Sequence, residues 1–255
     1  MTIDETYQLQ PGDTLSAIAD AHHLPLPELL AANQQISNPN TVQVGQLINI
    51  PCPTDPATPA SPVAAGYDGI HPALGTTNID RSALIFPPVT STPANRSTAL
   101  YNEVIDQLAV GYNPRYLPGE GCTYCNIFVW DVTRALDCPM PHWIMPDGAI
   151  AAPLQAGASE ITINGGAAWM REYGVKNYGW QPADAATAQQ FANEGKVAIA
   201  IWANPTGGHG HTVVVRPGAI TAQGPAIAQA GSVNFNYGHL ANGFGSIEPS
   251  FYVHA

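Results

Sequence analysis

The residues best able to do chemistry gather around Cys125. In the run GCTYCNIFV, residues 121–129, a glycine-containing loop leads into a predicted helix over 126–136, and Cys125 stands where the two meet. The unpaired amides and the dipole at a helix start favour the thiolate, which is the reactive form of cysteine. The same amides can hold the oxyanion of a tetrahedral intermediate. This position therefore predicts a cysteine nucleophile that attacks a carbonyl carbon.

A cysteine nucleophile needs a base, which is normally a histidine held by a third polar group. His211 opens the apolar run HTVVV, so we expect it to begin a strand and to share one face with Val213 and Val215. His209 lies among glycines, where its position would be less fixed. We therefore predict that His211, rather than His209, is the base.

The third polar group is expected on the next predicted strand, over residues 226–230. Gln229 is a polar side chain there, among small apolar neighbours. If this strand pairs antiparallel with the strand of His211, Gln229 can lie beside the imidazole and orient it. Asn234 is the alternative, and the sequence leaves the choice between the two open.

Cys122 and Cys125 also form a C-x-x-C pattern, which occurs in redox pairs and in zinc sites. A thioredoxin-like pair needs a strand directly before the first cysteine, and the preceding run RYLPGEG does not have a strand's pattern. A structural zinc site needs a second pair, which Cys138 alone does not supply. Four cysteines are too few for a disulfide scaffold in this chain, and Cys122 with Cys138 is the pair we expect if one is bridged.

The elements that would position these residues are helices followed by strands. Apolar residues at helical spacing predict a helix over 126–136. Helices are also expected over 97–108 and over 184–193, the last of which stops near Gly195. Strands are predicted over 197–202, 212–216 and 226–230. Helices followed by consecutive strands indicate an α+β domain with an antiparallel sheet.

Residues 7–51 read as a separate compact unit. A short strand is followed by the turn PGDT, in which Asp13 or Thr14 would cap a first helix. A second helix is predicted over 27–33 and a closing strand over 44–50. The predicted order is therefore strand, helix, helix, strand.

This unit resembles a LysM module over its whole length, YQLQPGDTLSAIADAHHLPLPELLAANQQISNPNTVQVGQLINIP. The most specific parts are PGDTL followed by IA, the run LLAAN, the NP turn and the ending VGQLINIP. The resemblance implies binding of glycans that contain N-acetylglucosamine, in peptidoglycan or chitin. It also implies two loops that flank a shallow sugar groove: Gly12, Asp13, Thr14 and Leu15 in one, and Asn38, Pro39 and Asn40 in the other.

The C-terminal domain resembles the NlpC/P60 and CHAP group of papain-like cell-wall hydrolases over about residues 113–237. The resemblance rests on the segments NPRYLPGEGCTYCNIFVWDV, GKVAIAIWANPTGGHGHTVVV and AIAQAG. They supply a cysteine at a helix start, a histidine that opens a strand and a polar residue on the following strand. By this likeness Cys125 is the nucleophile, His211 the base and Gln229 the third member.

The sequence departs from the commoner pattern of this group in two places. Asn126 follows the cysteine where a small serine is often found, and Gln229 stands where histidine is frequent. In the group a tyrosine upstream of the cysteine often helps to hold the oxyanion. Tyr112 and Tyr116 are both candidates for that role here.

Between the two units, nine prolines stand among alanine, threonine and serine from residue 51 to residue 94. Such a composition predicts a semi-extended spacer. We therefore expect a LysM-like module over 1–51, a proline-rich linker over 52–94 and a papain-like α+β hydrolase domain over 95–255.

The bulk composition narrows the partners. The 255-residue chain has a formal net charge of −11 and no basic stripe, which argues against nucleic acid or an anionic membrane as a partner. Its longest apolar stretch, 197–203, is far shorter than a bilayer span. The hydrolase resemblance implies a secreted or wall-associated protein, although the N-terminus shows no signal-peptide pattern.

Together these features predict a peptidoglycan hydrolase that a LysM module directs to the wall. It would cut an amide bond of the peptide stem as a cysteine peptidase or N-acetylmuramoyl-L-alanine amidase, with no metal or organic cofactor. Two alternatives remain: a chitin- or peptidoglycan-binding protein with an inactive hydrolase-like domain, and an acyltransferase that uses the same cysteine and histidine.

Overall fold

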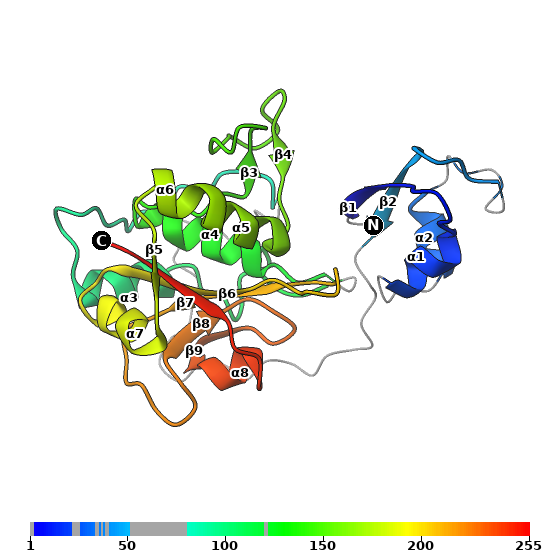
Figure 1. Ribbon diagram of the computed structural model, residues 1–255. Helices are drawn as coiled ribbons and strands as arrows, with labels where there is room; N and C mark the ends of the chain where they lie inside the picture. Colours follow the sequence, from blue (N-terminus) through cyan, green and yellow to red (C-terminus); the bar gives the residue numbers. More distant parts are fainter. Residues whose placement is uncertain are drawn as a thin grey trace. The chain divides into compact units, whose positions relative to one another are not determined.

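The computed structural model of the chain describes residues 3–21, 26–33, 36, 38, 41–51, 81–119 and 122–255. The chain divides into two compact units (Figure 1). The predicted glycan-loop residues Pro39 and Asn40, together with Cys52, lie outside the described residues, as does the first part of the predicted linker.

The N-terminal unit has the predicted order of strand, helix, helix, strand. Its elements are β1 (Ile3–Gln8), α1 (Leu15–Ala21), α2 (Leu26–Ala31) and β2 (Leu47–Pro51). The two strands pair antiparallel, with Tyr7 opposite Ile48. Thr14 rather than Asp13 caps α1, because its Oγ1 accepts a hydrogen bond from the Ala17 amide at 3.1 Å.

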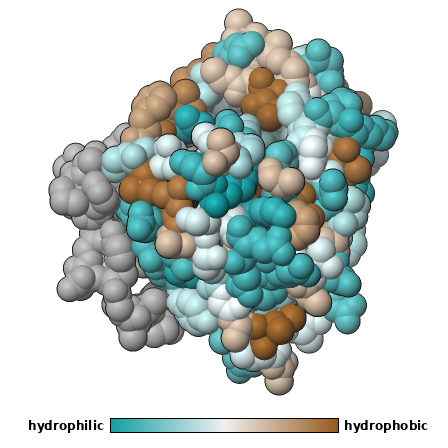
Figure 2. Space-filling view, turned by 90° about the vertical axis from the view of Figure 1, so that its left-hand side faces the viewer, coloured by the Kyte–Doolittle hydropathy of each residue, from teal (hydrophilic) through white to brown (hydrophobic). Residues whose placement is uncertain are grey.

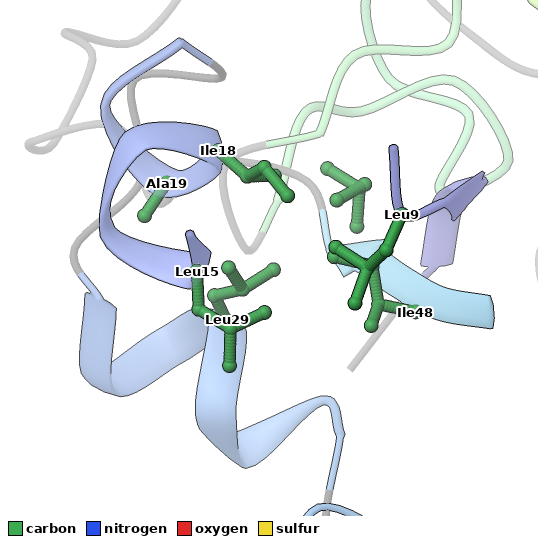
Figure 3. Packing of buried hydrophobic residues seen from close by; sticks show 7 residues of the cluster. Leu9, Leu15, Ile18, Ala19, Leu29 and Ile48 are labelled. Atoms are coloured by element: carbon green, nitrogen blue, oxygen red, sulfur yellow. The ribbon is translucent and has the colours of Figure 1, made fainter. Parts of the chain in front are cut away.

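A small hydrophobic core holds this unit together (Figure 3). Leu15 and Leu29 meet where the two helices face each other, and they are approached by Ile48 from β2 and by Leu9, the residue after β1. The other buried members are Ile18, Ala19 and Ile50. The predicted apolar face of the first helix is therefore confirmed.

Asn33 fastens the second helix of this unit to the closing strand. Its side-chain amide donates to the Leu29 carbonyl at 2.7 Å and to the Asn49 carbonyl at 2.6 Å, and its Oδ1 accepts from the Asn49 amide at 2.7 Å. The side chain is buried, so these bonds satisfy groups that water does not reach. This asparagine ends the run LLAAN that the sequence analysis singled out.

The C-terminal unit is α+β, and the three predicted helices are present. They are α3 (Thr98–Asp106), α4 (Cys125–Ala135) and α7 (Ala185–Asn193). Ser97 caps α3 by accepting from the Leu100 amide at 3.1 Å, and Asp184 caps α7 by accepting from the Thr187 amide at 2.7 Å. These capping side chains fix where the two helices begin.

A six-stranded antiparallel sheet forms the centre of this unit, in the order β5-β10-β6-β7-β8-β9. The three predicted strands are β6 (Val197–Trp202), β7 (His211–Val215) and β8 (Ala226–Gln229). The sequence analysis did not predict the outer strands β5 (Gln181–Ala183) and β9 (Phe235–His239), or β10 (Ser250–His254). The last strand of the chain thus inserts beside β6, which covers an edge that would otherwise be exposed.

The remaining elements of the C-terminal unit are short. They are the hairpin of β3 (Trp143–Ile144) and β4 (Ser159–Glu160), the helices α5 (Ile163–Trp169), α6 (Val175–Asn177) and α8 (Leu240–Phe244), and a π-helical turn, η2 (Met170–Gly174). Figure 1 shows α4 and α5 running along the sheet. Helix α4 packs against β7 and β8, α5 against β6, and α8 against β8 and β9.

The last part of the predicted linker, residues 81–94, is attached to the C-terminal unit by backbone carbonyls. Arg115 Nη2 donates to the Ala83 carbonyl at 2.9 Å, and Arg134 Nη1 donates to the Ile85 carbonyl at 3.2 Å. Because Arg134 lies on α4 and Arg115 is paired with Asp131 of the same helix, this stretch runs along α4.

A buried ion pair lies between α4 and the loop before it. Arg115 donates through Nε to Asp131 Oδ2 at 2.7 Å and through Nη2 to Asp131 Oδ1 at 3.2 Å. The Tyr116 hydroxyl donates to the same carboxylate at 2.8 Å. All three residues are buried, so each charge depends on its partners for compensation.

On the face that Figure 2 shows, hydrophobic residues form separate patches within a mostly hydrophilic surface. The most exposed large hydrophobic side chains are Phe86 and Leu154. No helix among the described residues has both the length and the apolar character needed to cross a membrane.

The buried pair yields a stability prediction. Arg115→Ala leaves the Asp131 carboxylate uncompensated, so we expect the free energy of unfolding to fall by about 3–5 kcal/mol. Tyr116→Phe removes one hydrogen bond to the same charge and should cost about 1.5–3 kcal/mol. Chemical denaturation followed by tryptophan fluorescence measures both. An Arg115→Ala protein that unfolds at the wild-type midpoint would show that the pair does not stabilise the fold.

Candidate active site

The structure brings His211 and Gln229 together on the neighbouring antiparallel strands β7 and β8. His211 Nε2 lies 2.9 Å from Gln229 Oε1. Gln229 Nε2 donates to the Val233 carbonyl at 2.8 Å, which fixes the orientation of the amide. The amide oxygen therefore accepts from the imidazole, so that the proton sits on Nε2 and Nδ1 keeps the basic lone pair.

Burial lowers the pKa of His211 below its usual value of 6.5, and the hydrogen bond to Gln229 opposes this by favouring the charged ring. The Phe244 ring is part of the apolar surroundings, with its centroid 5.0 Å from that of the imidazole. Burial therefore favours the neutral imidazole. It can therefore accept a proton from a thiol.

Asn234, the alternative third residue, has a different position. Its Oδ1 accepts from the Gly231 amide at 2.8 Å, and its Nδ2 donates to the Val110 carbonyl at 2.9 Å and the Tyr116 carbonyl at 2.8 Å. It is fully buried. Asn234 thus secures the turn that supplies the Val233 carbonyl, while Gln229 contacts the imidazole.

Cys125 is the first residue of α4 and is 4% exposed. The capping residue, Tyr124, makes no side-chain hydrogen bond to the helix start. This helix packs against β7 and β8, the strands of His211 and Gln229. The catalytic roles of the three residues stay a prediction, which their placement on these packed elements favours.

The predicted disulfide between Cys122 and Cys138 is wrong. Cys122 is disulfide-bonded, whereas Cys138 and Cys125 are outside disulfides. The spacing of the cysteines could not reveal that Cys138 is unbonded. Cys138 follows α4 and is enclosed in the core, where it is 3% exposed. Cys122 and Cys125 do not form a redox pair in the structure, because Cys125 is outside disulfides whereas Cys122 is bonded.

Tyr116 is not placed to hold an oxyanion. Its ring packs edge-on against Phe128 at 5.4 Å, and its hydroxyl is bound to Asp131. Tyr112 remains the candidate from the sequence, since it is only partly buried. Among the described residues, no group of three or more His, Cys, Asp or Glu side chains is arranged to hold a metal ion.

The predicted glycan loop of the N-terminal unit combines polar and core positions. Gly12 adopts a left-handed conformation with φ of 93°, which favours glycine at this turn. Asp13 Oδ2 accepts from the Gln10 amide at 2.7 Å and from the Tyr7 hydroxyl at 2.9 Å. Leu15 points into the core, so any contact that it makes with a sugar would use its backbone.

In the second predicted glycan loop, the structure describes Asn38 but not Pro39 or Asn40. The Asn38 residue is exposed, and its backbone carbonyl accepts from the Thr41 amide at 3.2 Å. The assignment of these seven residues to sugar binding stays a prediction.

Two residues that touch the imidazole–amide pair, Gly243 and Phe244 of α8, were not predicted from the sequence. A Cβ atom on Gly243 would lie 2.3 Å from Gln229 Oε1. The signal for α8 is weak because the helix has five residues, LANGF, with a glycine inside it. Only the three-dimensional structure places this helix against β8.

The two cysteines outside disulfides are expected to differ in reactivity. Burial raises the pKa of Cys138 to about 12, although the nearby Arg96 acts to lower it. At about pH 7 iodoacetamide should therefore alkylate Cys125 and spare Cys138 in the folded protein, since the thiolate is the reactive form. Mass spectrometry of the digested protein measures both sites, with denatured protein as the control. Equal labelling of Cys138 in the folded chain would contradict the prediction.

Comparison with known proteins assigns the N-terminal unit. The family model "LysM domain" matches residues 7–51. Among curated proteins, the secreted LysM effector ECP6 of Passalora fulva is 44% identical over 50 residues, which are 19% of this chain and 22% of that relative. A LysM domain implies binding of N-acetylglucosamine-containing glycans such as chitin or peptidoglycan. Residues 7–51 of this chain are a LysM domain.

Proposed function

We propose that the chain is a secreted or wall-associated peptidoglycan hydrolase whose C-terminal domain cleaves an amide bond of the peptide stem. The LysM domain would hold the enzyme on the glycan. The C-terminal domain would act in the manner of the papain-like cysteine hydrolases, as a stem peptidase or an N-acetylmuramoyl-L-alanine amidase. Secretion is supported by the similarity to a secreted LysM effector, which covers the LysM region alone.

The observation that carries the proposal is the His211–Gln229 pair at 2.9 Å, on strands against which α4 packs. A half-buried histidine whose Nε2 proton is held by an amide presents a basic Nδ1. Helix α4 begins with a cysteine, and its capping residue makes no side-chain hydrogen bond to the helix start. A nucleophile, a base, an orienting group and oxyanion donors are the parts that acyl transfer requires.

In this mechanism His211 Nδ1 removes the thiol proton of Cys125, and the thiolate attacks the carbonyl carbon of the stem amide. The amides at the start of α4 stabilise the resulting oxyanion. The imidazolium then gives its proton to the leaving amine as the C–N bond breaks, which leaves a thioester on Cys125. His211 next deprotonates a water molecule, which hydrolyses the thioester and restores the thiol.

The two alternatives predict different products. A binding protein with an inactive C-terminal domain would retain purified wall on its LysM domain and release no fragments. An acyltransferase would pass the acyl group from Cys125 to an added amine instead of water. The basic Nδ1 of His211 favours a working catalytic site, and the LysM domain favours the wall as its substrate.

The nucleophile is tested by a pair of cysteine variants. Cys125→Ala should lower the release of wall fragments by at least about 1,000-fold, because the carbonyl then has no nucleophile. Cys138→Ala should keep its activity, because this thiol lies outside the proposed site. Release of soluble peptides from purified peptidoglycan, with a chelator present in parallel, measures both. An active Cys125→Ala protein, or activity that a chelator removes and zinc restores, would overturn the cysteine mechanism.

Removing residues 1–51 tests whether the LysM domain only holds the enzyme on the wall and takes no part in the reaction. The LysM domain has its own core, so its loss should lower the effective concentration of enzyme at the wall without changing the chemistry. We expect weaker retention on insoluble wall and slower digestion, with unchanged cleavage of small soluble muropeptides. If the truncated, folded protein loses activity on both substrates in equal proportion, the LysM domain shapes the active site instead.

A further inference from the structure

Helix α8 contacts both members of the imidazole–amide pair through two consecutive residues. The Phe244 ring lies 5.0 Å from the His211 ring, measured between centroids. Gly243 lies so close to Gln229 that an added Cβ would be 2.3 Å from its Oε1, and 3.1 Å from Ile227 Cδ1. Real Cβ atoms do not approach other heavy atoms within 3.0 Å, so only the hydrogen of glycine fits here.

The backbone of α8 is anchored independently of the pair. The His239 amide donates to Asn242 Oδ1 at 2.7 Å in a capping box. The amides of Leu240 and Ala241 donate to carbonyls in the loop before β8, each at 3.0 Å. Two hydrogen bonds to the loop before β8 and one within the capping box thus hold α8, and with it Gly243, against β8.

The Gln229 side chain is the part that would move. Its amide is the far end of a flexible chain, and leaving its place breaks its hydrogen bonds to His211 and to the Val233 carbonyl. Gly243 itself has no left-handed backbone that would penalise another residue. In a helix, alanine is favoured over glycine by about 0.5–1 kcal/mol. A methyl group at residue 243 therefore displaces the Gln229 amide from His211, and we expect it to leave the fold of the domain intact.

We propose that Gly243 is a positioning residue for the reaction, and that α8 is a clamp which holds the Gln229 amide against His211. Gly243 leaves the space that the amide oxygen occupies, and Phe244 closes one side of the imidazole. The consequence for catalysis rests on the proposed function of Cys125 and His211. The clamp itself is a property of the structure without substrate.

The test is Gly243→Ala in the full chain. We expect kcat on soluble muropeptides to fall about 100-fold with KM little changed, because the base is misplaced while the binding surface is intact. The unfolding midpoint should stay near that of the wild type. Nitrogen NMR of the imidazole should change from a single Nε2-protonated form to a mixture of tautomers, since Gln229 no longer selects one.

Gln229→Ala provides the matched control, because it removes the same hydrogen bond from the other side. The spectrum of Gly243→Ala should match that of Gln229→Ala, and the double variant should be no less active than Gln229→Ala alone. Losses that multiply in the double variant would overturn the proposal. So would an unchanged tautomer in Gly243→Ala, or a Gly243→Ala protein that fails to fold.

The NMR measurement separates this proposal from the proposed function. If the wild type hydrolyses no wall substrate, the proposed function fails, and the tautomer change in Gly243→Ala still decides whether α8 clamps the pair. If the wild type hydrolyses wall and Gly243→Ala is fully active with a wild-type spectrum, the clamp is wrong and the proposed function stands.

Discussion

The hydrogen bond between His211 and Gln229 is the constraint on which the proposed chemistry depends. A carboxamide can present either its oxygen or its nitrogen, and only the oxygen leaves Nδ1 of the imidazole as the basic atom. The Val233 carbonyl selects the orientation of the Gln229 amide, because it accepts a hydrogen bond from Gln229 Nε2 at 2.8 Å. Asn234 holds the turn that contains this carbonyl. The tautomer of His211 is therefore set indirectly, by residues that contact Gln229 and not the imidazole itself.

The same buried network reaches the helix of the proposed nucleophile. The Tyr116 backbone carbonyl accepts from Asn234, and its hydroxyl donates to Asp131 in the middle of α4. Arg115 neutralises that carboxylate from the adjoining position at 2.7 Å. One loop therefore connects the turn after β8 with α4, which restricts movement of the cysteine helix relative to the strand of the base.

Much of this architecture could be predicted from local sequence signals. Side-chain caps at Ser97 and Asp184 and the buried run of β6 mark elements by short-range chemistry, and β7 and β8 follow from their apolar residues. The insertion of β10 beside β6 depends on residues distant in the chain, and the contact of Gly243 with Gln229 depends on the placement of α8. Such contacts leave no local pattern, and this is also why the Cys122–Cys138 pairing was wrong and why Gln229 could not be separated from Asn234.

The central claim is that Cys125 and His211 share a proton, and titration of the His211 imidazole by NMR tests it most directly. Wild-type protein is compared with Cys125→Ala across the acidic and neutral range. If the thiol and imidazole are coupled, a thiolate beside the ring favours its charged form, so removing the thiol should lower the pKa of His211. Identical titration curves for the two proteins would show that Cys125 does not act on this histidine, and would contradict the proposed mechanism.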